Sequence, residues 1–115
     1  QLLCDYTEEG DVKALGIIPG KVRRFPNQVK VPQMGWNTIS ETQTTIFQDI
    51  KHNEFMYLVH SYFVPILPET IAVSTYHQPY SVGLNKDNFY GVQFHPEKSS
   101  KAGQQLLQNF LNISK

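Results

Sequence analysis

Two residues near the end of the sequence have the types and spacing of a catalytic base and the acid that orients it. His95 and Glu97 stand in the stretch GVQFHPEKSS, where an apolar, alternating run ends and Pro96 separates the two side chains. Residues two apart in an extended backbone point the same way, so the imidazole and the carboxylate can face one direction. A carboxylate bonded to one imidazole nitrogen fixes the tautomer, and the other nitrogen can then take a proton from a nucleophile. The pattern indicates nucleophilic chemistry at the end of a strand, where α/β sheets gather their sites.

The same spacing also occurs without chemistry. A histidine and a glutamate on a surface loop before a helix would give the same sequence pattern without any catalytic role. So short a motif is therefore weak evidence by itself. The other histidines, His52, His60 and His77, lack the spacing of metal ligands, so we expect no metal and no cofactor. We expect His60 to be a buried structural residue of a strand. Cys4 is the only cysteine, and lone cysteines are more often small buried hydrophobic residues than catalysts.

Composition narrows the class of protein. The 115 residues fit one domain, and the 10 basic and 10 acidic residues cancel, which argues against a role driven by bulk charge on nucleic acid or membrane. Seven Phe, six Tyr and one Trp argue against disorder. A single cysteine excludes an internal disulfide framework and is typical of a reducing compartment such as the cytoplasm. We expect no membrane span and no signal peptide.

The elements that must position this pair follow from the hydrophobic patterns. A short helix carrying Leu2, Leu3 and Tyr6 is expected to end at Gly10. Residues 44–50 favour one or two turns of helix, and residues 55–64, apolar on both faces, favour a buried central strand. Gly35 permits a tight turn. Further strands are expected over 21–25, 29–32, 70–76, 80–85 and 89–94, with a hairpin turn at 85–88.

The period changes after residue 99. Apolar residues then recur at helical spacing, with Ser99 or Ser100 available as N-cap. They are Ala102, Leu106, Leu107, Phe110 and Leu111. Several strands and a closing amphipathic helix predict a mixed α/β protein built in layers.

Four segments in order resemble one known family. GVQFHPEKS is similar to the histidine–glutamate motif of the class I, triad-type glutamine amidotransferases. VPQMGWN (Val31 to Asn37), YLVHSY (Tyr57 to Tyr62) and EEGDVKALGIIPGKVRRFP (Glu8 to Pro26) resemble the branch formed by the glutaminase subunits of imidazole glycerol phosphate synthase. The resemblance covers essentially the whole chain and implies their three-layer α/β fold with a mixed sheet. Gln33, where the family often has His, and Met56, where an aromatic residue is usual, depart from the pattern.

The resemblance assigns roles to individual residues. It implies that His95 is the base of a Cys-His-Glu triad and Glu97 the acid that orients it, in the hydrolysis of glutamine to glutamate and ammonia. It implies substrate contacts for Gln1, Ser61 and Tyr62, although Gln1 could equally be an exposed terminal residue. The family's nucleophile elbow ends in Q-L-L, the letters with which this sequence begins. We therefore expect residues 1–115 to be the C-terminal portion of a single amidotransferase domain whose cysteine lies upstream.

The resemblance also implies a protein partner. Trp36, Tyr57 and Lys98 match family residues around the opening that faces the cyclase subunit of the synthase. That subunit is a (β/α)8 barrel, and it uses the ammonia in histidine biosynthesis. The alternatives are a core position for Trp36 and a solvated Lys98. Two further functions stay open: a non-catalytic docking module with this fold, or a sister amidotransferase of another pathway. The M-G-W-N and H-S-Y segments favour the synthase branch over the sisters.

Overall fold

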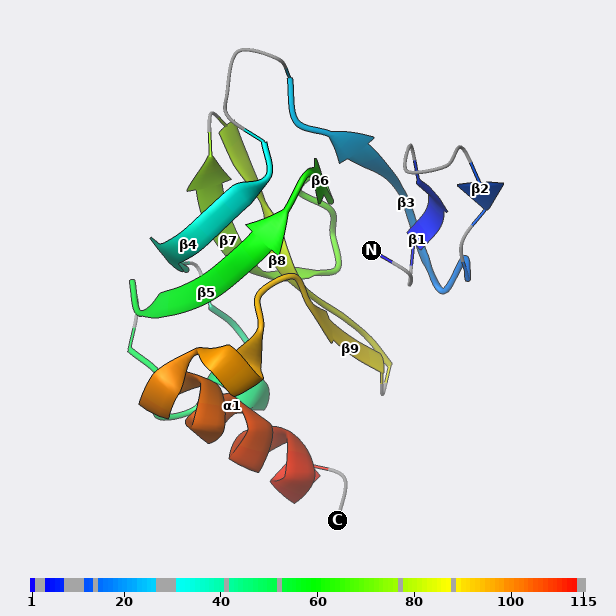
Figure 1. Cartoon of the computed structure of the whole chain (residues 1–115). Coiled ribbons are helices and arrows are strands. Elements are labelled where there is room, and N and C mark those ends of the chain that lie inside the picture. Colours follow the sequence, from blue (N-terminus) through cyan, green and yellow to red (C-terminus); the bar gives the residue numbers. More distant parts are fainter. Residues whose placement is uncertain are drawn as a thin grey trace.

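The computed structural model describes residues 1, 4–7, 12–13, 15–26, 31–40, 42–51, 53–76, 78–87 and 89–113 (Figure 1). Within these residues short strands surround a main core and a smaller second one, and one longer helix follows the last strand. The elements are β1 (Cys4–Thr7), β2 (Val12–Lys13), β3 (Ile18–Arg24), β4 (Gln33–Thr38), β5 (Phe55–His60), β6 (Tyr62–Phe63), β7 (Thr70–Tyr76), β8 (Gln78–Lys86), β9 (Phe89–Val92) and α1 (Ser100–Ile113), with 3-10 turns at Thr45–Phe47 and Pro96–Lys98. The mixed α/β class is confirmed.

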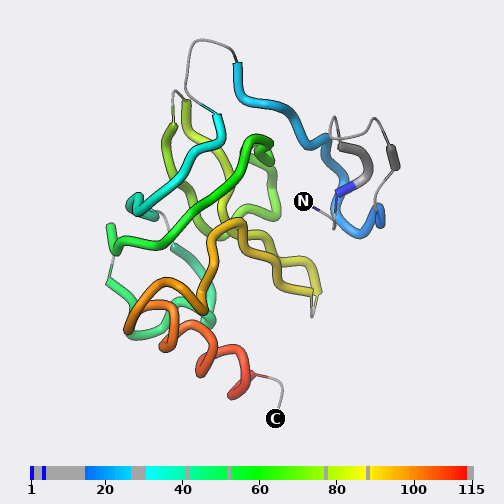
Figure 2. Tube along the Cα trace, viewed as in Figure 1, coloured from blue at the N-terminus to red at the C-terminus, as the bar shows by residue number. Residues whose placement is uncertain are grey.

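The described strands pair in three sheets. Their orders are β2-β1-β3-β6, β4-β5 and β7-β8-β9, and only β1 and β3 run parallel. Bridges between Ser40 and Val73 and between Val64 and Ser81 join the sheets. The tube in Figure 2 shows the chain leaving β9, passing beside β5 and entering α1. No helix in the described part of the chain has the length and apolar character needed to cross a membrane.

The prediction of a short helix ending at Gly10 is wrong for residues 4–7, which the structure describes. Cys4–Thr7 form strand β1, which pairs with Ile18–Arg24 on one side and Val12–Lys13 on the other. Short apolar runs suit either structure, and pairing with a neighbouring strand decides between them. Leu2, Leu3 and Gly10 lie outside the described residues.

The segment around Gly35 is a strand, whereas a tight turn was predicted. Strand β4 pairs with β5 in a continuous register that sets Trp36 opposite Tyr57 and Gln33 opposite His60. Gly35 has a φ of 122°, a backbone conformation open to glycine and costly for other residues, so it is accommodated within the strand. Of the strand predicted over 29–32, residues 29 and 30 lie outside the described part, and 31–32 precede β4.

The long central strand predicted over 55–64 divides at Ser61. Strand β5 pairs with β4, whereas β6 pairs with β3, and the Ser61 carbonyl accepts a hydrogen bond from the Phe25 amide at 3.0 Å. Burial along β5 alternates, and Phe55 is 53% exposed, so only one face of this strand is covered. The change of partner at Ser61 brings Tyr62 beside β3, opposite Arg24.

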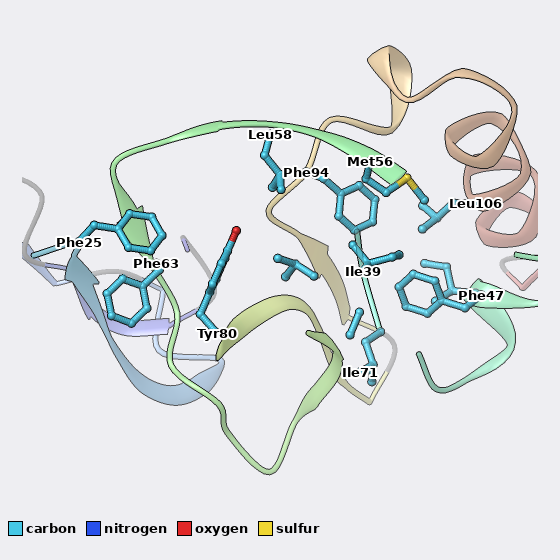
Figure 3. Close-up of a cluster of buried hydrophobic side chains, with 13 residues drawn as sticks. Phe25, Ile39, Phe47, Met56, Leu58, Phe63, Ile71, Tyr80, Phe94 and Leu106 are labelled. Atoms are coloured by element: carbon cyan, nitrogen blue, oxygen red, sulfur yellow. The ribbon is translucent and has the colours of Figure 1, made fainter. Parts of the chain in front are cut away.

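The main core runs from a cluster of aromatic rings at one end to a mixture of aliphatic and aromatic side chains beneath α1 (Figure 3). Phe25 stacks on Phe63 with ring centroids 4.9 Å apart and meets the edge of Tyr80 at 5.5 Å. At the other end, Met56 and Leu106 pack close to Phe94. Phe94 directly precedes His95, so burial of its ring anchors the loop that carries the predicted base.

Helix α1 covers the core with a different stripe from the one predicted. Leu106 is buried and Ala102 packs on the core, but Leu107, Phe110 and Leu111 are exposed. Asn109 is buried instead, because its amide nitrogen donates to the carbonyls of Ile46 and Gln48 at 3.0 and 2.6 Å. These two bonds orient the helix on the turn at Thr45–Phe47, which is the short helical segment predicted within 44–50.

Candidate active site

His95 and Glu97 form the predicted pair. Nδ1 of His95 lies 2.8 Å from Oε1 of Glu97, and both side chains are partly open to solvent. Because a carboxylate can only accept, Nδ1 carries the proton and Nε2 of a neutral ring is left as an acceptor. The backbone that achieves this differs from the expectation: His95 is extended, but Pro96–Lys98 form a 3-10 turn that carries the carboxylate back to the ring.

The pKa of Glu97 is lowered by its surroundings. The hydrogen bond from His95 contributes most, followed by the backbone amide of Glu97 itself, and the charge of Lys98 acts in the same direction. The carboxylate therefore stays ionised and remains an acceptor for the imidazole.

The His95 loop is held against strand β5 by backbone and hydroxyl bonds. The His95 amide donates to the Tyr57 carbonyl at 2.9 Å. Ser99, which was predicted as a possible N-cap of the helix, donates its hydroxyl to the His95 carbonyl at 2.6 Å and accepts from the Tyr57 amide at 3.0 Å. The hydroxyl is buried, so these bonds form in a protected environment.

Gly103 lets helix α1 approach this loop. A Cβ atom added at Gly103 would lie 2.0 Å from the Pro96 carbonyl oxygen. The amide of Gly103 donates to the Ser99 carbonyl at 3.0 Å, so helix and turn are in direct contact. Neither Ser99 nor Gly103 was assigned a role in the site from the sequence. A glycine inside an otherwise regular helix was the available signal for a close backbone approach.

The three residues predicted at a partner interface lie together. Trp36 and Tyr57 are paired across β4 and β5, with ring centroids 6.0 Å apart and planes at 76°. The ammonium of Lys98 lies 5.8 Å from the centre of the Tyr57 ring, within range of a cation–π contact. Trp36 is 50% exposed, so the alternative of a core tryptophan is wrong for this chain.

Gln1 contacts the segment with which it was predicted to share a substrate. Its amide nitrogen donates to the Tyr62 carbonyl at 2.9 Å and to Oε1 of Gln93 at 2.7 Å. Gln93 lies two residues before His95 and was not identified from the sequence. Ser61, the third predicted substrate residue, is half-buried, and its carbonyl is taken by Phe25.

His60 is buried next to these residues, as expected for a structural histidine. Its Nδ1 lies 2.7 Å from the Tyr62 carbonyl, and its Nε2 lies 2.9 Å from Oε1 of Gln33 and 3.1 Å from the Tyr80 hydroxyl. Burial lowers the pKa of His60, which keeps the ring neutral. Burial likewise raises the pKa of Tyr80, which keeps its hydroxyl protonated.

Neither a thiol nor a metal cluster accompanies His95 in the described part of the chain. Cys4 is fully buried with Ile18 and Val22, in a second small core. Among the described residues no group of three His, Cys, Asp or Glu side chains is placed to hold a metal. A hollow of about 580 Å³ beside the site is lined by Trp36 and Ser99, among others, but by neither member of the pair.

Comparison with known proteins places the chain among amidotransferases. The family model for "Glutamine amidotransferase class-I" matches residues 1–113. The chain is 48% identical over 116 residues to the imidazole glycerol phosphate synthase subunit HisH of Bacteroides fragilis, covering 98% of this chain and 59% of that protein. It is 48% identical over 123 residues to the Neisseria gonorrhoeae protein of the same name, covering 97% of this chain and 58% of that one. The Haemophilus influenzae protein of that name is 43% identical over 113 residues, with 96% and 57% covered. The chain thus spans less than two thirds of the length of these relatives.

A solved structure shares the fold. It is a protein of Thermoplasma acidophilum described as one part of a candidate GMP synthase. The TM-score is 0.65 at 23% sequence identity, over 82% of this chain and 48% of that one. At this identity the likeness concerns the fold alone.

Proposed function

Because the chain belongs to the class-I glutamine amidotransferase family, we propose that His95 and Glu97 serve the hydrolysis of glutamine to glutamate and ammonia. The observation that carries the proposal is the 2.8 Å bond between Nδ1 of His95 and Oε1 of Glu97. It fixes the tautomer and leaves Nε2 to exchange a proton with a thiol.

The proposed reaction has two steps. A cysteine thiol gives its proton to Nε2 of His95, and the thiolate attacks the carboxamide carbon of glutamine. The C–N bond breaks, ammonia leaves with the proton from His95, and a thioester remains. Water then gives a proton to the same nitrogen, attacks the thioester carbon and releases glutamate and the thiol. General base catalysis of this kind is worth about 10²–10⁴-fold in rate.

We propose that the thiol comes from a cysteine ahead of Gln1, and that residues 1–115 form the later part of the amidotransferase domain. The resemblance of the first three letters to the end of the nucleophile elbow supports this, as does the 59% coverage of the Bacteroides fragilis protein. Cys4 is a poor candidate, because its side chain is fully buried and has no solvent access for a substrate.

The substrate-holding edge is proposed to comprise Gln1, Ser61 and Tyr62. The hydrogen bond between Gln1 and the Tyr62 carbonyl supports a common site for the first and last of these. The edge continues into the base through Gln93, which accepts from the same Gln1 amide.

The partner is proposed to be the cyclase subunit of imidazole glycerol phosphate synthase. The names of the relatives, which describe them as subunits of that synthase, support this choice. Ammonia is mostly protonated in neutral water and is then a poor nucleophile, so a docked partner that receives it directly suits the chemistry. The half-exposed Trp36, with Tyr57 and Lys98 beside it, offers an aromatic surface of the kind that anchors interfaces.

The test uses the full-length protein that carries this sequence, assembled with the cyclase subunit. We expect His95→Ala to lower glutamine-dependent turnover by about 10²-fold or more. Ammonia-dependent synthesis by the complex should be unchanged, since it bypasses the thioester. Gln104→Ala, an exposed change on α1, serves as the matched control.

Each contrary outcome has a distinct meaning. Glutamine turnover that survives His95→Ala would refute the assignment of the base. Loss of ammonia-dependent synthesis as well would mean that His95 supports folding or docking. A wild-type complex that uses ammonia but never glutamine would identify a non-catalytic docking module, and activity with a different synthase would identify a sister amidotransferase.

A further inference from the structure

We propose that His60 is a positioning residue that sets the Tyr62 carbonyl and, through it, Gln1. This inference rests on the proposed function, since it concerns the edge that would hold glutamine. The imidazole of His60 is buried and has no part in the proposed reaction. His60 is 7% exposed and lies between two groups of polar partners, one on each ring nitrogen.

The Nδ1 side of the ring points to the site. Nδ1 lies 2.7 Å from the Tyr62 carbonyl oxygen, which has no proton, so Nδ1 is the donor. The same oxygen accepts the Gln1 amide at 2.9 Å. A carbonyl with two donors has both of its lone pairs used, so its direction is fixed by them. Without His60, only Gln1 would hold this oxygen in place.

The Nε2 side of the ring points to the core. A neutral ring with its proton on Nδ1 must accept at Nε2. The Tyr80 hydroxyl lies 3.1 Å from Nε2 but donates to Oε1 of Gln33 at 2.7 Å, so it becomes free to donate to the ring when the Gln33 amide turns its nitrogen toward the ring. The Gln33 amide lies 2.9 Å from Nε2 and can donate as well when its nitrogen faces the ring, because its two ends have the same shape. Tyr80 is fully buried and Gln33 is nearly so, and these two residues therefore hold the ring still.

The chain of contacts reaches the proposed base. From the Tyr62 carbonyl it passes through the Gln1 side chain to Oε1 of Gln93 at 2.7 Å, and the backbone amide of Gln93 donates to the Val82 carbonyl at 2.9 Å. Gln93 and His95 are two residues apart on the same segment. His60 thus connects the buried core to the substrate-holding edge.

Two substitutions separate the two sides of the ring. In His60→Asn the side-chain nitrogen takes the place of Nδ1, so the bond to Tyr62 is kept and the Nε2 contacts are lost. In His60→Gln the side-chain oxygen can take the place of Nε2 as the acceptor, so the contacts to Gln33 and Tyr80 are kept and the bond to Tyr62 is lost. Both remove the ring, so a purely structural role predicts similar effects from the two.

The experiment measures glutaminase kinetics of the full-length protein with its cyclase partner, together with thermal unfolding. We expect His60→Gln to raise the KM for glutamine about fivefold to tenfold with a small change in kcat, the value of one lost hydrogen bond in binding. His60→Asn should recover most of the wild-type KM. Equal KM values in the two variants, or a change confined to the melting temperature, would overturn the inference.

A second variant covers the case in which His60→Gln does not fold. Tyr80→Phe keeps the ring that fills the core and removes the hydroxyl from Nε2. A rise in KM of about twofold is expected, because the ring is loosened and not removed. An unchanged KM would overturn the inference. The proposed function fails separately: wild-type protein without glutamine turnover overturns both proposals, whereas normal turnover with no KM effect overturns only this one.

Discussion

Tyr57 and Ser99 are joined by a hydrogen bond of 3.0 Å from the Tyr57 amide to the Ser99 hydroxyl. The same hydroxyl donates to the His95 carbonyl at 2.6 Å, and the His95 amide donates back to the Tyr57 carbonyl at 2.9 Å. The backbone of strand β5 thus holds the loop of the proposed base at two points. The position of the imidazole depends on this serine although it lies four residues after His95.

Ser99→Ala should destabilise the protein and lower its activity. The change leaves the partly buried Tyr57 amide without its acceptor, and the loss of such a hydrogen bond costs about 1 kcal/mol in the free energy of unfolding. The His95 carbonyl keeps the Lys98 amide at 3.0 Å, so the loop loosens without being released. Urea unfolding and glutamine turnover of the full-length protein measure the two effects. Ser100→Ala, an exposed neighbour, should alter neither, and an equal loss in both variants would contradict the role given to Ser99.

Gly103→Ala should displace the turn that carries Glu97. Alanine gains about 1 kcal/mol over glycine in helix propensity, but its Cβ would meet the Pro96 carbonyl oxygen at 2.0 Å, so the clash dominates. Forced repacking of this kind typically costs about 1–3 kcal/mol. We expect a lower melting temperature and a lower kcat in the full-length enzyme. Gln104→Ala on the exposed side of α1 should be neutral or slightly stabilising; a stable, fully active Gly103→Ala protein would show that helix and turn tolerate separation.

Trp36→Ala should weaken binding of the cyclase subunit. A half-exposed tryptophan at an interface centre is worth about 2 kcal/mol or more, which corresponds to roughly thirtyfold in Kd. Titration calorimetry of the two subunits gives the affinity directly. Phe89→Ala is the matched control, because Phe89 is also a half-exposed aromatic residue but lies on β9. Weakening by Phe89→Ala alone would move the interface away from Trp36.

Burial of His60 should make the stability of the protein depend on pH. Desolvation lowers the pKa of His60 in the folded state below its ordinary value of 6.5; the hydrogen bond to the Tyr62 carbonyl opposes this shift, and the charge of His95 adds to it. The unfolded chain therefore binds more protons than the folded one between these two pKa values, so stability falls as pH drops below 6.5. At pH values well above 6.5 the His60 ring is neutral in both states, and it then adds no pH dependence to the free energy of unfolding.

The measurement compares wild-type protein with His60→Asn. Urea unfolding at a series of pH values should show a steeper loss of stability below pH 6.5 in the wild type, since asparagine does not titrate. Identical slopes in the two proteins would mean that His60 keeps an ordinary pKa on folding.

Local chemistry made several features predictable from the sequence. The His95–Glu97 pair follows from residue type and a spacing of two, which any turn or strand at that point brings within reach. Strands β7 and β8 and helix α1 were recognisable because long runs with a clear period have few alternative structures. The position of Gln1 beside Tyr62, and of Trp36 beside Tyr57 and Lys98, agrees with the family motifs.

Tertiary structure decided the remaining features. Pairing with β3 made Cys4–Thr7 a strand, and the change of partner at Ser61 divided a run that looked continuous. The roles of Ser99, Gly103 and Gln93 depend on contacts that form only in the folded chain. The local spacing of apolar residues does not predict such contacts. The same holds for His60. Its burial was predictable from an apolar strand, but its link from the core to the Tyr62 carbonyl exists only because β4, β5 and β8 bring Gln33 and Tyr80 to one ring.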